Sequence, residues 1–162
     1  MDESFNLQDI HASTGIAIQR LRYVLDQAML PGTRTPAWSR GRGSPRVFTA
    51  FDAFAIACAA LLLKAGLRRR VVRDCMTITC DNNEGRRDVA SVPLYQAFRE
   101  RSTAFLEVGD GDFVRLVGAG DYLRRPLLFG WVMISTKMLA EAYEPLVTIR
   151  IDVARLRRLL KK

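Results

Sequence analysis

The chain begins with two short amphipathic segments that are separated by a glycine-containing break at residues 13–15. We expect the first helix to be capped by Asn6 and to end near Ala12. A second helix is predicted to begin at Ile16 and to end at Met29–Leu30–Pro31, because a proline disfavours the helical conformation in the residue before it. Two helices joined by such a turn form a helix-turn-helix, and this element constrains the fold most.

The second helix is predicted to have one apolar and one polar face. Its apolar face is expected to carry Ile16, Ile18, Leu21, Val24 and Leu25. Its polar face is expected to carry Gln19, Arg20, Arg22, Tyr23 and Asp26. These polar side chains are therefore the ones that a binding partner would meet.

Residues 31–46 form an arginine-rich segment without any acidic residue. Three prolines and three glycines punctuate this segment, which is typical of a loop or hairpin. The lack of acidic residues favours contact with a polyanion, and a solvated surface loop is the alternative. The four basic side chains are Arg34, Arg40, Arg42 and Arg46.

The whole chain of 162 residues has a formal net charge of +8, and 21 of its 25 basic residues are arginines. The guanidinium group makes forked contacts with phosphate and guanine, so the composition favours a nucleic-acid partner. No apolar run reaches the roughly 20 residues that a membrane span needs, and the acidic start does not fit a secretory signal. We therefore expect a cytoplasmic protein without a membrane partner.

A short strand is predicted at residues 46–48, followed by a helix that Thr49 caps and that stops at Gly66. A fourth helix is expected from Leu67 to about Met76. Four arginines lie on it, most of them near its start, where the helix dipole disfavours cations. A phosphate, or an acidic group from the C-terminal half or from a second subunit, would compensate them. These residues are Arg68, Arg69, Arg70 and Arg73.

The character of the chain changes after residues 81–85, which predicts a boundary between a unit at 1–80 and a unit at 81–162. Strands are expected at 102–108, 113–117, 127–135 and 146–151, with a hairpin turn at 109–112. A short helix is expected from Lys137 to Tyr143, and a basic amphipathic helix from Asp152 to Leu160. The second unit is therefore predicted to be a small α+β domain.

The first 76 residues resemble the DNA-binding head of the MerR-type winged-helix regulators. The resemblance lies in the order helix, turn, helix, basic loop, strand, helix, helix. The motifs that carry it are Thr14–Gly15–Ile16, Leu21–Arg22–Tyr23, Met29–Leu30–Pro31 and Arg46–Val47–Phe48–Thr49. The chain departs from the family at Val24, where a tyrosine is usual, and lacks the long dimerising helix after the head.

The resemblance implies an N-terminal winged helix-turn-helix. Together with the small α+β domain that the pattern of the tail predicts, this gives an expected α+β fold. The resemblance also implies a dimeric, sequence-specific transcriptional regulator of duplex DNA, for which simple occlusion of polymerase, as by a repressor, is the most economical mechanism. Base contacts would come from Ala17, Gln19 and Arg20, contacts with phosphates or base edges from Arg22 and Tyr23, and contacts of the wing from Arg40, Arg42 and Arg46.

An excisionase-like architectural or protein-interaction factor is the alternative, because such proteins share the same head. The folded tail favours a regulator, and an edge strand or the final helix of the tail is expected to form the homodimer. A fragment without residues 82–162 is then expected to be folded and monomeric. The tail aromatics belong to the core or, alternatively, to a small-molecule pocket. They are Phe105, Phe113, Phe129 and Trp131.

Enzyme chemistry finds little support in the sequence, because His11 is the only histidine and no phosphate-binding loop or nucleophile elbow occurs. We therefore expect neither a catalytic site nor a cofactor nor a metal. Residues 110–112 read as a hairpin turn rather than as a metal ligand set. Cys75 and Cys80 are expected to be inert thiols, with redox sensing as the alternative.

Overall fold

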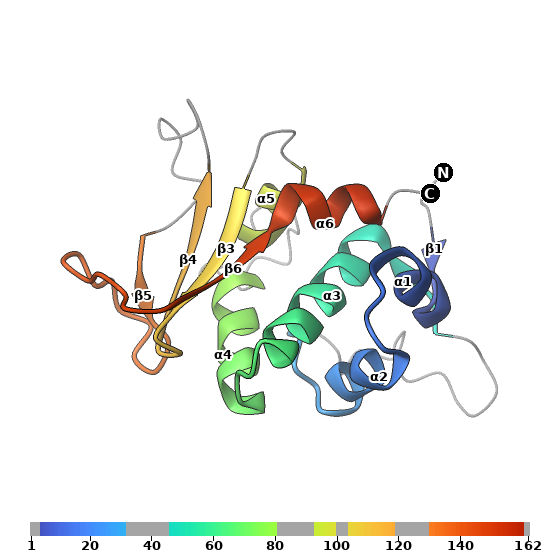
Figure 1. Ribbon diagram of the computed structural model, residues 1–162, viewed down its shortest axis with the longest axis horizontal. Coiled ribbons are helices and arrows are strands. Elements are labelled where there is room, and N and C mark those ends of the chain that lie inside the picture. Colours follow the sequence, from blue (N-terminus) through green and yellow to red (C-terminus); the bar gives the residue numbers. More distant parts are fainter. Residues whose placement is uncertain (1–3, 32–45, 81–92, 100–103, 119–129, 161–162) are drawn as a thin grey trace.

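The computed structural model describes residues 4–31, 46–80, 93–99, 104–118 and 130–160. The first half contains β1 (Ser4–Phe5), α1 (Leu7–Thr14), α2 (Ile18–Asp26), β2 (Phe48–Thr49), α3 (Ala50–Lys64) and α4 (Arg69–Cys80). The second half contains α5 (Pro93–Arg99), β3 (Ala104–Gly109), β4 (Phe113–Gly118), β5 (Val132–Met133), β6 (Thr148–Asp152) and α6 (Val153–Leu159). The mixture of helices and strands fits the predicted α+β class. Figure 1 shows α3 in the middle, with the larger sheet on one side and α1 and α2 on the other.

The first two helices lie close to their predicted positions. Asn6 caps α1 in a reciprocal capping box with Asp9. The helix runs two residues beyond the predicted end, to Thr14, and stops at Gly15, whose φ of 71° favours glycine. The second helix is shorter than predicted because it begins at Ile18 and ends at Asp26.

The strand predicted at residues 46–48 is found at Phe48–Thr49 as β2, which pairs antiparallel with β1. Phe48 lies opposite Phe5, and both side chains are buried. The returning chain therefore closes against the N-terminus. Arg34, Arg40 and Arg42 lie outside the described residues, so the arginine-rich loop stays a prediction.

Thr49 caps α3, as the sequence predicted, and the structure shows that it does so in a capping box with Asp52. Nine of its fifteen residues are buried, because α3 is covered by neighbours on nearly every side. The helix ends at Lys64, and Gly66 leads away with a φ of 97°. The next helix, α4, starts two residues later than predicted and runs four residues further, to Cys80.

The larger sheet is antiparallel, with the order β5-β4-β3-β6. Gly109 pairs with Phe113, so residues 110–112 form the predicted hairpin turn. Side chains alternate across the sheet, and Leu106, Val108 and Leu116 are buried on the face towards the helices. The final helix α6 follows β6 directly and is capped by Asp152.

Residues 127–143 differ from the prediction in two ways. The run at 127–135 contains only the two-residue strand β5 within its described part, residues 130–135. The segment from Lys137 to Tyr143 is not a helix, because the chain folds back on β5 instead. The backbone N–H of Met133 donates to Met138 O at 2.8 Å, and that of Ala140 donates to Trp131 O at 2.8 Å. Lys137 takes a φ of 58° at this reversal.

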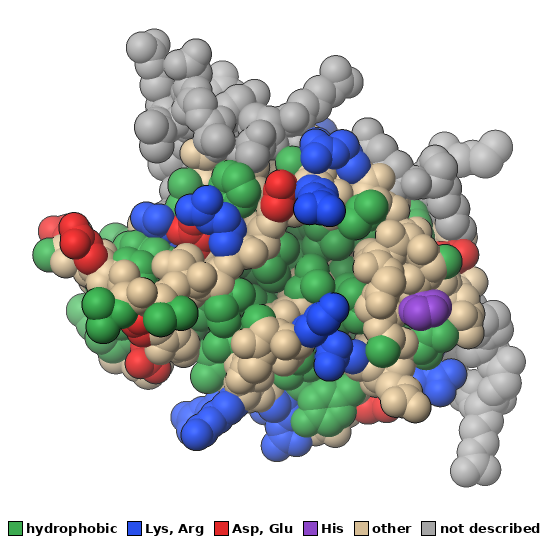
Figure 2. All heavy atoms as spheres, in the orientation of Figure 1, with side chains coloured by type: hydrophobic (Ala, Val, Ile, Leu, Met, Phe, Trp, Pro, Cys, Tyr) green, Lys and Arg blue, Asp and Glu red, His purple; other side chains and the backbone are tan. Residues whose placement is uncertain are grey.

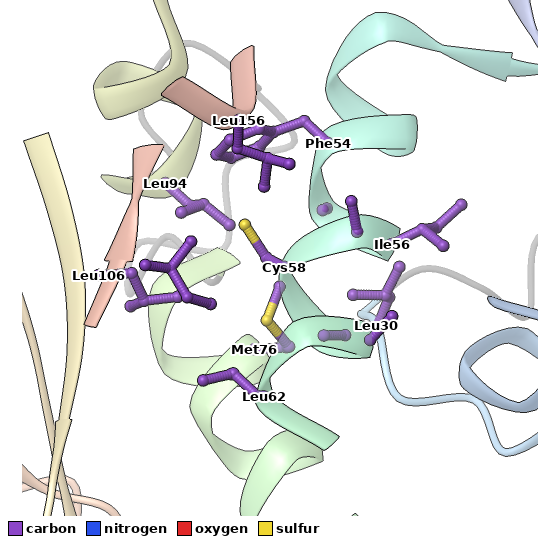
Figure 3. Close-up of a cluster of buried hydrophobic side chains, with 14 of the residues drawn as sticks. Leu30, Phe54, Ile56, Cys58, Leu62, Met76, Leu94, Leu106 and Leu156 are labelled. Atoms are coloured by element: carbon purple, nitrogen blue, oxygen red, sulfur yellow. The ribbon is translucent and has the colours of Figure 1, made fainter. Parts of the chain in front are cut away.

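The described residues form one continuous hydrophobic core to which both halves contribute. Figure 3 shows Leu94, Leu106 and Leu156 of the second half pointing towards Cys58 of α3, with Met76 of α4 beside it. The helix α5, which the sequence did not predict, stacks on α3 through Phe54 and Phe98, with ring centroids 5.1 Å apart. Because residues 81–92 lie outside the described part, the boundary at residues 80 and 81 stays a prediction.

Candidate nucleic-acid interface

The exposed face of α2 presents three of the predicted site residues. Gln19 and Arg22 are exposed, and the ring of Tyr23 is 42% exposed. On the opposite face Leu21, Val24 and Leu25 are buried against the core, as the periodicity predicted. The helix is therefore fixed on one side and offers an amide, a guanidinium and a phenol on the other.

Ala17 and Arg20 occupy less prominent positions at the start of the same helix. Ala17 is exposed and occupies the N-cap position of α2, where its methyl group forms no capping hydrogen bond. Arg20 is half-buried. The turn before them is fixed by His11, whose Nδ1 lies 2.8 Å from Ile16 O. The only histidine of the chain therefore contacts the backbone of the turn that positions α2.

Arg46 is the one described member of the predicted wing arginines, and it lies next to α2. Its Nη1 is 3.7 Å from Asp26 Oδ1, and both side chains are well exposed, so this ion pair contributes little stability. Arg22 and Arg46 line the same groove, which has a volume of about 440 Å³ and lies between the start of α1 and α2. The structure thus brings together two arginines that are 24 residues apart in sequence. Arg40 and Arg42 lie outside the described residues.

The arginines of α4 have an intramolecular partner that the sequence analysis did not consider. The guanidinium of Arg69 donates to Gln27 Oε1, and Arg73 Nη2 donates to Gln27 O at 3.0 Å. Arg70 lies 4.0 Å from Asp74, one turn further along α4. Gln27 directly follows α2, so these contacts hold the end of that helix. No local pattern indicates them, because the partners are 42 and 46 residues apart.

Basic side chains also gather on the surface around these helices. Figure 2 shows Lys and Arg side chains along the lower edge of the view, over α4 and α2. Arg69, Arg70 and Arg73 of α4 are exposed, with Arg22 on the neighbouring α2. This surface attracts polyanions over a range of about 10 Å, the screening length at ordinary salt.

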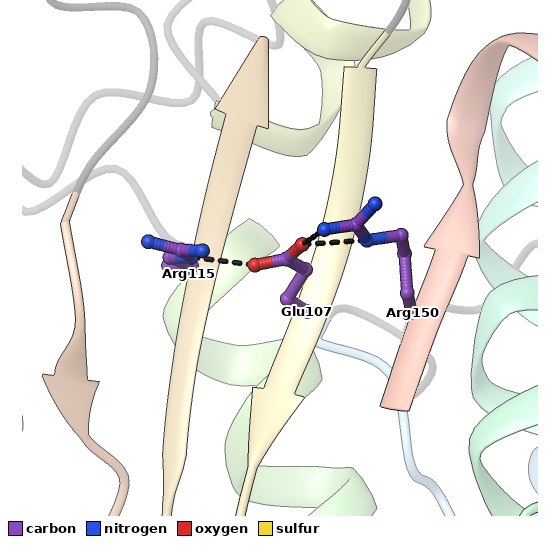
Figure 4. A network of polar contacts seen from close by, with 3 residues as sticks. All are labelled: Glu107, Arg115 and Arg150. Atoms are coloured by element: carbon purple, nitrogen blue, oxygen red, sulfur yellow. Dashed lines mark hydrogen bonds and ion pairs between the residues drawn. The ribbon is translucent and has the colours of Figure 1, made fainter. Parts of the chain in front are cut away.

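A buried ion-pair network lies in the sheet, at a position that the sequence analysis missed. Glu107 of β3 is fully buried and sits between Arg115 of β4 and Arg150 of β6 (Figure 4). Its Oε2 is 2.5 Å from Arg115 Nε, and its Oε1 is 2.7 Å from Arg150 Nε. The two guanidinium groups also lie over the rings of Trp131 and Phe105, 4.3 and 4.7 Å from the centroids. The network locks three strands together.

The tail aromatics are engaged with neighbouring side chains. Phe113 stacks on Tyr143 with ring centroids 3.6 Å apart, and Trp131 meets Tyr143 edge-on at 5.4 Å. Phe105 lies beneath Arg150. The groove beside α2 and a second groove beside β6 are lined by other residues, and Phe129 lies outside the described part. The small-molecule pocket therefore stays an untested alternative.

Asp110 at the hairpin turn is bound to the segment before β6. Its carboxylate accepts hydrogen bonds from the Tyr143 hydroxyl and from the backbone N–H groups of Val147, at 2.9 Å, and Leu146, at 3.2 Å. These bonds, chiefly the one from Tyr143, hold the pKa of Asp110 below its ordinary value. Among the described residues, no group of three or more His, Cys, Asp and Glu is arranged to hold a metal ion.

We predict that the chemical shift of the Val147 amide proton follows the protonation of the Asp110 carboxylate, whose pKa lies below its ordinary value of 3.8. The ionised carboxylate is the form that accepts these bonds. The contribution of these hydrogen bonds to the stability of the fold is therefore complete above pH 3.8 and is lost as the pH falls through the lowered pKa of Asp110. The chemical shift of this proton in an acid titration by NMR measures it. The titration should vanish in Asp110→Asn and persist in Asp112→Asn; its persistence in Asp110→Asn would refute the assignment.

All three cysteines lie in the described part of the chain as free thiols, and Cys58 and Cys75 are buried. Burial raises the pKa of Cys75 to about 12, and it also raises the pKa of Cys58. The thiolate is the reactive form, so both groups are nearly inert at neutral pH. Cys80 is half-buried. The redox alternative thus has no support at Cys75.

Comparison of the chain with protein-family models, with curated proteins and with solved structures found no match. Within the described residues, no helix is long and apolar enough to cross a membrane. The resemblance to the MerR-type head therefore rests on its sequence motifs, and the geometry around α2 is the second line of argument for a function.

Proposed function

We propose that this chain is a sequence-specific DNA-binding regulator of MerR-like type that acts as a dimer and represses by occluding polymerase. The observation that carries the proposal is the exposed face of α2, on which Gln19, Arg22 and Tyr23 lie together with Arg46 beside them. An α-helix fits the major groove of duplex DNA. Gln pairs with adenine through two hydrogen bonds, and Arg pairs in the same way with guanine.

The supports of α2 suit a recognition helix. Such a helix must be held rigidly, because a displacement of about 1 Å breaks a two-bond contact with a base. Leu21, Val24 and Leu25 anchor one face in the core, while Gln27 at the end is bound by two arginines of α4. The arginines of α4 therefore act first as positioning residues in this proposal. The net charge of +8 supplies the sequence-independent part of the affinity.

A dimer is part of the proposal because two heads are needed to read two half-sites. Among the described residues, four of the seven exposed large apolar side chains lie between residues 138 and 147. Several exposed apolar side chains within one short segment favour a protein contact. These residues are Met138, Leu139, Leu146 and Val147.

We predict that Leu146→Glu converts a dimer into a monomer. The Leu146 side chain is 96% exposed in the single chain, so the substitution places a charge in the interface without disturbing the core. Light scattering on the full chain measures the outcome, with Val47→Glu as the control because Val47 is exposed elsewhere. A monomeric wild type, or a Leu146→Glu variant that dimerises as well as the wild type, would show that this interface is wrong.

The first test of the function is the salt dependence of binding to duplex DNA of random sequence. If each head makes about five contacts with phosphates or bases, the logarithm of the affinity of the dimer should fall against the logarithm of the salt concentration with a slope steeper than about −4. Fluorescence anisotropy of labelled duplex measures this slope. The Arg22→Ala variant should flatten it by about one for each phosphate that is no longer neutralised. Arg158→Ala, an exposed arginine of α6, is the matched control. Undetectable or salt-independent binding would refute the proposal.

A further inference from the structure

One edge of β6 is paired with no other strand among the described residues, because β6 is the last strand in the order β5-β4-β3-β6. The backbone N–H of Asp110 donates to Val147 O, so these two residues are a hydrogen-bonded pair of the antiparallel ladder. The adjacent pair, Gly109 and Thr148, is therefore a non-hydrogen-bonded pair, in which the backbone groups of the two residues point away from each other. Arg150 has the same orientation, since orientation alternates along a strand. The N–H and C=O groups of Thr148 and Arg150 therefore point outward at this edge.

A groove of about 430 Å³ runs beside the same edge. One wall is β6, the opposite wall is the end of α3 with Ile16, and α6 closes one end. Its apolar lining includes Leu61, Leu156 and Leu159, and Leu159 is 44% exposed. In the space-filling view, apolar side chains line the hollow between the β6–α6 segment and the N-terminal helices (Figure 2).

The rim of the groove is basic. Arg155 is exposed, and its side chain is in no ion pair within the described part of the chain. Arg150 shares the single charge of Glu107 with Arg115, so this triad keeps one net positive charge. Asp152 also lines the groove, and its carboxylate caps α6 through Arg155 N at 2.8 Å. Its negative charge offsets one of these positive charges, so the rim keeps a net positive charge. Negative charge on an occupant would thus be attracted to the rim.

We propose that this groove binds an extended acidic peptide segment of a partner protein, which pairs with β6 as an added strand. Unpaired backbone groups at a sheet edge give such a peptide its main-chain hydrogen bonds, and the apolar lining receives alternate side chains. The flanking acidic side chains meet Arg150 and Arg155. A second copy of this chain does not suit the groove, because its own sheet and helices would meet α3 and Ile16 on the opposite wall.

The test is a selection of random linear peptides displayed on phage against the full chain, followed by affinity measurements with the synthetic peptides. We expect enriched peptides to carry net negative charge and apolar residues at alternate positions. Replacement of their acidic residues by lysine should weaken binding about tenfold or more.

Two pairs of variants locate the site. A proline at an edge strand removes one outward N–H and leaves the other edge of the strand intact, so Arg150→Pro should bind about tenfold more weakly than Arg150→Ala. Arg155→Glu should lose about tenfold, whereas Arg158→Glu, which is exposed but does not line the groove, should bind like the wild type.

Three results would overturn the proposal. The first is a selection that enriches no peptide or enriches basic ones. The second is that the selected peptides bind Arg155→Glu as well as Arg158→Glu, which decides the matter even where Arg150→Pro does not fold. The third is that Arg155→Glu changes the oligomeric state of the chain, because a second copy would then be the occupant. None of these results depends on DNA binding.

Discussion

A fragment that ends at Cys80 should be largely unfolded in solution. The sequence predicted the opposite, a folded head, because the four helices and the strand of residues 1–80 contain enough apolar residues for a core. The structure changes this expectation because the core is shared between both halves. Phe54, Cys58 and Met76 are fully buried, and residues of the second half cover them.

The size of the effect follows from the surface that truncation exposes. Returning a large buried side chain to water costs about 1.5–3 kcal/mol, and the removal of cover from α3 and α4 involves several such side chains. A small domain is stable by only about 5–15 kcal/mol in total, so truncation consumes most of its stability. Phe54, for example, is left without the ring of Phe98 against it.

Far-UV circular dichroism of the fragment and of the full chain measures this effect. The fragment should show weak helical signal and no cooperative thermal transition, and addition of a second fragment of residues 81–162 should restore both. A fragment that unfolds cooperatively with native helix content would show that residues 1–80 are a domain in their own right.

The Glu107→Ala variant is expected to lose about 3 kcal/mol or more of unfolding free energy. Its carboxylate is the common partner of Arg115 and Arg150, and it is 1% exposed. Removing the acid leaves a guanidinium group on each side of β3 without its counter-charge, along with a cavity where the carboxylate was. The arginines are 33% and 57% exposed and reach water in part, which places the cost at the lower end of the range for buried networks.

Urea unfolding of the full chain measures this change in stability. Glu107→Gln, which keeps the shape and removes the charge, should lose less. Glu141→Ala is the matched control because Glu141 is exposed, and surface substitutions change stability by about 0.5 kcal/mol at most. Wild-type stability of Glu107→Ala would mean that the network does not hold the sheet.

Local signals explain which parts of the fold were predictable. The caps at Asn6, Thr49 and Asp152 act within one helical turn, so a few adjacent residues determine where α1, α3 and α6 begin. The hairpin at residues 109–113 was predicted for the same reason, since glycine and aspartate suit its turn. The apolar face of α2 followed from periodicity alone.

Contacts between distant residues explain the failures. The segment from Lys137 to Tyr143 has the composition of a helix, yet it is held as a turn by hydrogen bonds to β5 and to Asp110, 33 residues before Tyr143. Glu107 reads as a solvent-facing strand residue by alternation, and its burial is explained by its ion pairs with Arg115 on the neighbouring strand and with Arg150, 43 residues later. For the candidate site, the sequence supplied the exposed residues of α2 but not Gln27, whose arginine partners lie on α4.

Selection of binding sites from a random duplex library tests most directly whether α2 reads DNA sequence. We predict that the full chain enriches one motif. Gln19→Ala should then lose about 1–3 kcal/mol on that motif and much less on random duplex, whereas Arg46→Ala should weaken both about equally, as a phosphate contact does. A selection without an enriched motif, or equal losses on both duplexes for Gln19→Ala, would contradict a role of α2 in reading sequence.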